Sequence, residues 1–197
     1  MLSTMTTMAS GGYLTRGEAT EMIVENFKLQ DHKSAFLDQC NADLEICLFH
    51  FSGMTRYEEL RIDPLILYPD VFPAHPNYEA INLATKLDLV RGYINAENSP
   101  FLPQKEISKV EALKIVLGAS ETMKWKDNYE YSDEIDQMSS KLQNLTDISE
   151  NIMFNPDNWW KIRYYLFGIE KGILENFDPD SKITVDELNE MMKQTSL

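Results

Sequence analysis

The sequence predicts a mainly helical single domain made of repeated helix–loop–helix units, and three observations support this. Hydrophobic residues make up 43% and aromatic residues 11% of the 197 residues, a composition typical of a folded chain with a sizeable core. Apolar residues recur at helical spacing in several segments. Three of those segments begin with the same capping pattern, which predicts internal repeats.

The first capped segment is LTRGEATEMIV, residues 14–24. Thr15 and Glu18 form a Ser/Thr-x-x-Glu capping box, in which the hydroxyl accepts a hydrogen bond from a helix N–H and the glutamate accepts one from the N–H of the cap residue. Leu14 stands before the cap, at the position of a hydrophobic staple. The segment therefore predicts a helix that begins near Thr15.

Two further segments carry the same pattern. ISKVEALKIVL (107–117) has Ser108 and Glu111 at the capping positions, and ITVDEL has Thr184 and Glu187 there. We therefore expect helices that begin near Ser108 and Thr184, and we expect all three capped helices to pack together.

The repeat extends upstream of the second and third caps. Residues 101–111 (FLPQKEISKVE) and 177–187 (FDPDSKITVDE) both fit Phe-x-Pro-x-x-x-Ile-[Ser/Thr]-x-x-Glu without a gap. Each follows an apolar helical pattern, at 80–93 and at 165–177.

Two long connectors, residues 28–67 and 120–155, separate the copies. Runs such as EIDQMSSKLQNL indicate that residues 28–60 and 120–155 are partly helical insertions.

Residues 68–119 resemble a complete S-layer homology (SLH) motif. Four short elements carry the resemblance: Asp70-Val71, Gly92-Tyr93, Phe101-x-Pro103 and the helix start from Ile107 to Glu111. Residues 156–193 resemble a degenerate second motif, in which Gly172 stands at the helix end and Val185 replaces the basic residue of the cap. Residues 13–27 resemble the second half of a motif and contain its best Thr-Arg-x-Glu.

The resemblance implies a fold in which the motifs pack around a pseudo-threefold axis, with the capped helices as a three-helix core. It also implies a function, the non-covalent anchoring of a surface protein to a cell-wall polysaccharide. In this family the basic residue of the capping motif and the preceding turn line grooves between neighbouring motifs. The implied polysaccharide-binding residues are Arg16, Lys109, Asp70, Gly92 and Tyr93. The groove at Val185 should be weak.

Arg16 should matter more than Lys109, because its motif is the most complete and a guanidinium forms a bidentate fork with a carboxylate. A solvated side chain in the first helical turn is the alternative interpretation of Arg16. Trp160, in the pair Trp159-Trp160, is a further candidate because sugar faces stack on aromatic rings. Core packing is the alternative for this tryptophan.

The formal net charge of −14 argues against nucleic acid or an anionic membrane as a partner, since both need a basic surface. The same charge opposes an anionic sugar polymer unless local charge or salt screening intervenes. No apolar run is long enough to span a bilayer. The three histidines lack metal-ligand spacing, and no P-loop, dinucleotide fingerprint or nucleophile elbow is present. We therefore expect no enzymatic activity and no cofactor. The partner that the SLH resemblance implies is a cell-wall polysaccharide, with other surface proteins as further partners.

Two alternative functions stay open. In one, the degenerate motifs are a protein–protein scaffold and the inserted segments form the interface. In the other, residues 176–187 are an EF-hand-like calcium loop, with oxygen-bearing side chains at five ligand positions: Asn176, Asp178, Asp180, Thr184 and Glu187. Ser181 stands where such a loop needs glycine, and the repeat explains Pro179, so the repeat interpretation is preferred.

The first residues, MLSTMTTMASGG, do not resemble a signal peptide, so the expected extracellular, cell-surface location requires a signal that was removed or lies upstream. Cys40 and Cys47 are expected to form a disulfide, as exported proteins commonly do. On an unbroken helix their Cα atoms would be ~10 Å apart, beyond the ~7 Å that a disulfide tolerates. The Asn41-Ala42-Asp43 stretch is a plausible helix break. Two buried free thiols are the alternative.

Overall fold

The computed structural model describes residues 12–31, 34, 68–87, 89–93, 99–123, 159–175, 178 and 180–195. Most of both connectors lies outside the described residues. Cys40 and Cys47, with the disulfide predicted for them, lie outside as well.

The described residues fold into helices α1 (Arg16–Asn26), α5 (Tyr78–Lys86), α6 (Lys109–Met123), α9 (Trp159–Glu170) and α10 (Val185–Thr195). Extended pairing in this part of the chain is limited to isolated β-bridges. The prediction of a mainly helical fold is therefore confirmed. Among these helices, none combines the length and the apolar character needed to cross a membrane.

All three predicted helix starts carry complete capping boxes. The backbone N–H of the cap residue donates to the glutamate at 2.9 Å for Thr15–Glu18, 3.0 Å for Ser108–Glu111 and 2.9 Å for Thr184–Glu187. The return bonds, from the glutamate N–H to the cap hydroxyl, measure 3.3, 3.4 and 3.4 Å in the same order. The helix starts predicted near Thr15, Ser108 and Thr184 are thus confirmed.

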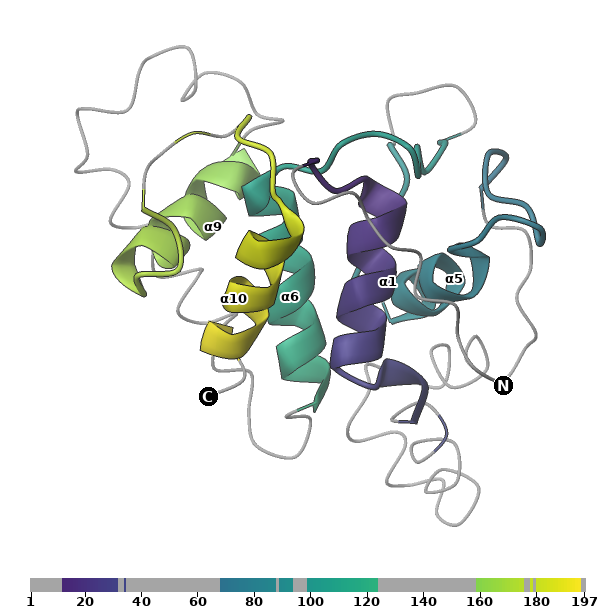
Figure 1. The fold of residues 1–197 in the computed structure, drawn as a ribbon, viewed down its shortest axis with the longest axis horizontal. Coiled ribbons are helices and arrows are strands. Elements are labelled where there is room, and N and C mark those ends of the chain that lie inside the picture. Colours follow the sequence, from purple (N-terminus) through teal and green to yellow (C-terminus); the bar gives the residue numbers. More distant parts are fainter. Residues whose placement is uncertain are drawn as a thin grey trace.

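The capped helices α1, α6 and α10 contact one another and form the centre of the molecule (Figure 1). Helix α6 contacts α1, α10 and also α9. Its buried side chains cover most of its circumference: Val110, Ala112, Leu113, Ile115, Val116, Leu117 and Ala119. Helix α10 instead buries a single stripe that includes Leu188, Met191 and Met192 and turns polar side chains outward.

The three segments that precede the caps are joined by a closed cycle of backbone hydrogen bonds. Ile107 N–H donates to the Leu14 carbonyl at 3.0 Å, Leu14 N–H to Ile183 at 2.9 Å, and Ile183 N–H to Ile107 at 3.4 Å. All three side chains are buried. Each apolar residue at the predicted staple position therefore contributes both to the core and to this ring.

The helices α5 and α9 lie outside the central three, on opposite sides in Figure 1. Helix α5 contacts α1, and α9 contacts α6. Each outer helix therefore packs on the capped helix that comes before it in the chain, and not on the capped helix that comes after it. The loop after each outer helix consequently crosses the N-terminus of the preceding capped helix.

Backbone hydrogen bonds hold both of these loops in the same way. Arg16 N–H donates to the carbonyl of Lys105 at 2.8 Å, and Lys109 N–H donates to the carbonyl of Ser181 at 2.8 Å. The chain leaves α9 through Gly172 at φ +70°, a left-handed conformation that favours glycine at a helix end. These two loop crossings define the two candidate sites.

Candidate functional site

The Arg16 site, where the loop before α6 crosses the start of α1, consists of Arg16, Asp70, Gly92, Tyr93 and Phe101. Arg16 is only 9% exposed, so its interpretation as a solvated side chain is wrong. Its terminal nitrogens donate to the carbonyl of Phe101 and, at 2.5 Å, to that of Arg91. Burial lowers the pKa of Arg16, against the opposing effect of Tyr93 and Glu111.

Two aromatic rings enclose the guanidinium of Arg16. Its central carbon lies 4.1 Å from the centroid of the Phe101 ring and 4.8 Å from that of Tyr93, within cation–π range. Backbone carbonyls and aromatic rings of the protein itself thus surround the guanidinium of Arg16, the group that the family resemblance implies would bind the polysaccharide.

Asp70 and Gly92 shape the loop around this arginine. The carboxylate of Asp70 accepts from the N–H groups of Phe101 at 2.8 Å and of Leu102 at 2.6 Å. Leu102 has φ +59°, an unusual conformation for a leucine that the Asp70 bond helps to hold. A Cβ on Gly92 would lie 2.4 Å from the carbonyl oxygen of Ser99, so only glycine fits there.

Tyr93 closes the Arg16 site toward α6. Its hydroxyl donates to Glu111 at 3.3 Å and accepts from the ammonium of Lys105 at 3.1 Å. The same ammonium lies 4.4 Å from the centroid of the Tyr93 ring. The structure therefore brings Arg16, Asp70, Gly92 and Tyr93 together in one compact cluster.

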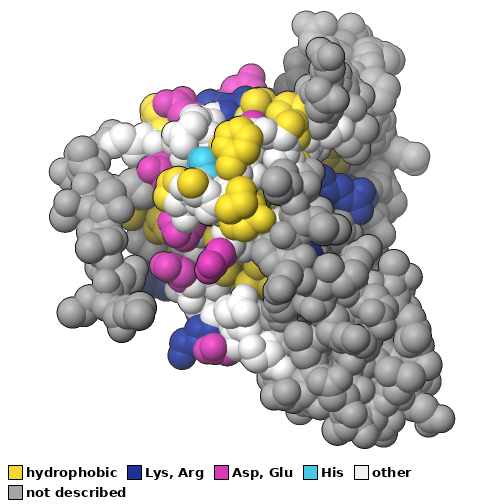
Figure 2. All heavy atoms as spheres, turned by 90° about the vertical axis from the view of Figure 1, so that its right-hand side faces the viewer, with side chains coloured by type: hydrophobic (Ala, Val, Ile, Leu, Met, Phe, Trp, Pro, Cys, Tyr) yellow, Lys and Arg dark blue, Asp and Glu magenta, His cyan; other side chains and the backbone are white. Residues whose placement is uncertain are grey.

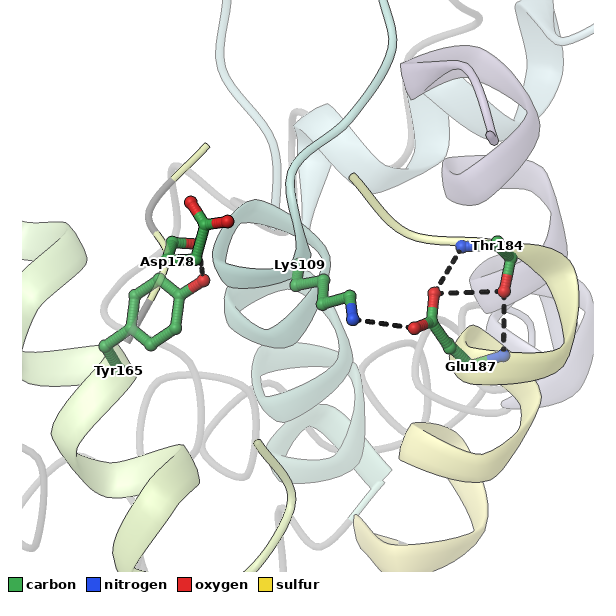
Figure 3. Close-up of polar contacts among 5 residues, drawn as sticks. All are labelled: Lys109, Tyr165, Asp178, Thr184 and Glu187. Carbon is green, nitrogen blue, oxygen red and sulfur yellow. Dashed lines mark hydrogen bonds and ion pairs between the residues drawn. The ribbon is translucent and has the colours of Figure 1, made fainter. Parts of the chain in front are cut away.

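Lys109 occupies the corresponding position at the second crossing, but its surroundings are open. A cavity of about 360 Å³ lies between α6, α9 and α10; we call it the Lys109 cavity. The side chain of Lys109 is 28% exposed and forms an ion pair of 2.6 Å with Oε1 of Glu187 (Figure 3). The described residues that line the cavity are Lys109, Tyr165, Gly172, Ile173, Leu174, Glu175, Asp178, Ser181, Ile183, Glu187, Glu190, Met191 and Gln194.

Glu187 divides its two oxygens between the cap and the cavity. Oε2 accepts from the backbone N–H and the hydroxyl of Thr184, at 2.9 and 3.0 Å, while Oε1 contacts Lys109. Burial raises the pKa of Glu187, but the hydrogen bonds from Lys109 and Thr184 outweigh it, so the pKa lies below its ordinary value.

Tyr165 forms the opposite wall of the Lys109 cavity. It extends from α9 toward the loop, where its hydroxyl donates to the backbone carbonyl of Asp178 (Figure 3). Burial, reinforced by the charge of Asp178, raises the pKa of Tyr165 to about 12. Tyr165 therefore remains a neutral hydrogen-bond donor that fixes the loop.

The sequence did not single out Tyr165, Glu175 or Glu190 as site residues. They enter the cavity because α9 packs on α6 and its following loop crosses toward α10, which is a long-range property of the fold. The sequence marks Asp178 only as an oxygen-bearing residue of a possible calcium loop.

Trp160 belongs to neither of the two sites in the described part of the chain. It lies on α9, where the ammonium of Lys114 is 4.9 Å from its ring and the Tyr164 ring is 6.2 Å away. Its side chain is partly exposed. The structure thus separates Trp160 from the other sequence-predicted residues.

The calcium interpretation can be compared with the residues around α10. Glu187, which would be the bidentate ligand at the last loop position, instead caps α10 and pairs with Lys109. The described residues contain no group of three or more His, Cys, Asp or Glu side chains placed to hold a metal ion. Asn176, the first residue of the supposed loop, lies outside the described residues.

No family model, curated protein or solved structure matches this chain. The described residues form a mainly helical fold in which loops cross the starts of capped helices. One crossing is closed around Arg16, and the other leaves the Lys109 cavity.

Proposed function

We propose that this chain is an SLH-like domain that anchors a surface protein non-covalently to a cell-wall polysaccharide. The observation that carries the proposal is the closed cycle of hydrogen bonds among Leu14, Ile107 and Ile183. Three equivalent segments around an axis would produce such a cycle. The bridge partners follow the same order, since Thr15 pairs with Glu106, Ser108 with Lys182 and Thr184 with Tyr13.

The recurring loop crossings support the same architecture. Arg16 and Lys109 stand at equivalent positions of two caps. The backbone N–H of each donates to a carbonyl of the loop that leads to the next capped helix, in both cases at 2.8 Å. In an SLH-like arrangement, these crossings are the grooves between neighbouring motifs. Val185 takes this position in α10 and offers no polar side chain, so the third groove is proposed to be weak.

The Lys109 cavity is the proposed binding site. Its volume falls within the range of small-ligand sites, and carboxylates, apolar residues and one aromatic residue line it. Arg16 is proposed to position the loop rather than to contact the sugar, because its guanidinium is already enclosed by Phe101 and Tyr93. Asp70 and Gly92 hold the same loop, and Trp160 offers a separate ring for stacking.

A pull-down with purified cell wall of the source organism tests this function. We expect the chain to sediment with the wall and to do so equally after the wall has been stripped of protein. Binding that is lost on deproteinisation would favour a protein partner, and no binding to either preparation would refute the anchoring function.

A protein–protein scaffold is the second candidate, favoured by one observation. Phe72 is 57% and Leu102 38% exposed, and the Asp70 bond to Leu102 keeps the two loops side by side. Figure 2 shows apolar side chains among acidic ones on the face of the molecule where α5 lies. We define Phe72 and Leu102 as the apolar patch; a protein that docks there would bind independently of the Lys109 cavity.

A further inference from the structure

We propose that the apolar patch of Phe72 and Leu102 docks a basic segment of a partner protein, which places an apolar side chain on the patch and its cationic side chains against α1. This inference is independent of the anchoring function and specifies the partner of the scaffold candidate. It follows from the exposure of the patch, from the contacts that fix its two loops, and from the carboxylates beside it.

The patch presents two large apolar side chains to solvent on a backbone that is fixed in place. Phe72 is 57% and Leu102 38% exposed. Leu102 has φ +59°, a conformation that a leucine rarely adopts, and the Asp70 carboxylate holds its N–H at 2.6 Å. Such costs in free energy concentrate where a residue serves binding. A backbone that is already fixed also reduces the entropy that docking would cost.

A second contact joins the two loops of the patch. The backbone N–H of His75 donates to the carbonyl of Phe72 at 2.8 Å, which closes the turn before α5. Nε2 of the His75 ring lies 3.4 Å from the side-chain nitrogen of Gln104, two residues after Leu102. The two loops are therefore held side by side at two points, by Asp70 and by His75.

Carboxylates of α1 lie beside the turn that carries Phe72. The turn ends at Asn77, whose side-chain amide donates to Glu21 at 2.7 Å. Glu18 and Glu25 stand one helical turn before and after Glu21 on α1. Burial raises the pKa of Glu21, and the charges of Glu25 and Glu18 raise it further, against the bond from Asn77. A cationic side chain that reached this face of α1 would relieve the repulsion among the three carboxylates.

This arrangement fits a partner segment in which arginine or lysine residues stand next to an apolar anchor. Figure 2 shows acidic side chains beside the apolar ones on this face of the molecule. The net charge of −14 attracts a cationic segment and repels an acidic one. A second copy of the chain carries the same charge, which disfavours self-association through this face.

The test is titration of the full chain with short synthetic peptides, measured by fluorescence anisotropy. The peptides share the same leucines and carry arginine, glutamine or glutamate at the other positions. We expect the arginine peptide to bind saturably and about tenfold more tightly than the glutamine peptide, and the glutamate peptide not to bind. No binding of the arginine peptide, or equal binding of the glutamine peptide, would overturn the inference.

Matched variants separate docking on the patch from attraction to an acidic protein as a whole. Phe72→Ser and Leu102→Asn each remove one apolar side chain, and asparagine tolerates the left-handed conformation of residue 102. Each should weaken binding of the arginine peptide about tenfold. Tyr13→Ser should leave it unchanged, because Tyr13 is equally exposed, at 57%, but pairs with Thr184 in the ring. Wild-type affinity in both patch variants, or an equal loss in Tyr13→Ser, would overturn the assignment to the patch.

A second matched pair tests the role of α1. Glu25→Gln and Glu190→Gln each remove one exposed negative charge, on α1 and on α10 respectively. Glu25→Gln should weaken binding of the arginine peptide about threefold, and Glu190→Gln should leave it unchanged. An equal effect of the two variants would contradict the placement of the cationic side chains against α1.

Sedimentation velocity and the wall pull-down test the other possible occupants of the patch. We expect Phe72→Ser to sediment like the wild type and to bind the wall equally well, because it leaves the Lys109 cavity intact. A dimer that Phe72→Ser dissociates, or wall binding that it abolishes, would overturn the inference. If the wall is bound but the arginine peptide is not, the docking proposal is wrong and the anchoring function stands.

Discussion

Arg16 illustrates how the surroundings of a side chain decide its role. The sequence presents it as the best basic residue for a carboxylate ligand, in the most complete capping motif. In the fold, its donors reach the carbonyls of Phe101 and Arg91, and it is packed between two aromatic rings. It ties the loop before α6 to the start of α1.

Replacing Arg16 by alanine should therefore reduce stability before it affects any ligand. Truncation would leave two carbonyl oxygens without their charged donor, which typically costs ~1–3 kcal/mol. Urea unfolding should show this loss for Arg16→Ala. Lys105→Ala, which removes an exposed ammonium and its hydrogen bond to the Tyr93 hydroxyl, should stay close to wild type. Wild-type stability with lost wall binding in Arg16→Ala would instead make Arg16 a ligand-binding residue.

The capping glutamates should make stability depend on acid pH. Burial raises the pKa of Glu111, but hydrogen bonds from Ser108 and the charge of Arg16 outweigh it and lower the pKa in the folded state. The pKa of Glu187 is lowered as well. A carboxyl group whose folded pKa is lowered stabilises the fold above its unfolded pKa, about 4.3, and this stabilisation disappears as the pH falls through the folded pKa.

We therefore expect the urea midpoint to be constant near neutral pH and to fall once the pH drops below about 4.5. Glu111→Gln should be less stable at neutral pH and should show a shallower decrease in acid. If its pH profile ran parallel to that of the wild type, Glu111 would not be a source of the acid sensitivity.

At the scale of the elements, the three caps are independent local units. Thr184→Ala should lower the free energy of unfolding by about 1 kcal/mol through loss of the cap hydroxyl. Wall binding should be unchanged at matched folding, because Glu187 keeps Lys109 as a partner. Denaturant unfolding and the wall pull-down measure the two effects, with Thr184→Ser as the control that preserves the hydroxyl. A loss of binding without a loss of stability would place Thr184 in the site itself.

The helix starts could be predicted from sequence because a capping box depends on residues only three positions apart. Thr15, Ser108 and Thr184 each carry their partner glutamate within the same turn, and apolar spacing indicates the face that packs. The mutual contact of the three capped helices followed from their repetition.

The partner of each outer helix could not be predicted in the same way. That α9 packs on α6, and not on the α10 that follows it, depends on contacts between residues far apart in the chain. The Lys109 cavity is a consequence of this crossing, so Tyr165 and Glu190 carry no local signal that would mark them. The burial of Arg16 is likewise invisible in a motif that resembles an exposed binding site.

At the scale of the whole molecule, a ring of three capped segments joins the helices, and the two loop crossings differ in how far they are closed. One crossing is a compact cluster around Arg16, and the other leaves the Lys109 cavity. The apolar patch of Phe72 and Leu102 lies with the Arg16 site, through the Asp70 bonds. The two proposed functions thus involve different surfaces: the Lys109 cavity for sugar binding and the apolar patch for protein binding.

The central claim, that the Lys109 cavity binds wall polysaccharide, is tested most directly by NMR titration of the isotopically labelled chain with polysaccharide released from the wall. We predict that the amide signals of Lys109, Gly172, Ile173 and Glu190 shift in a saturable manner, while those of Phe72 and Leu102 do not. No saturable shift, or shifts confined to Phe72 and Leu102, would contradict the claim.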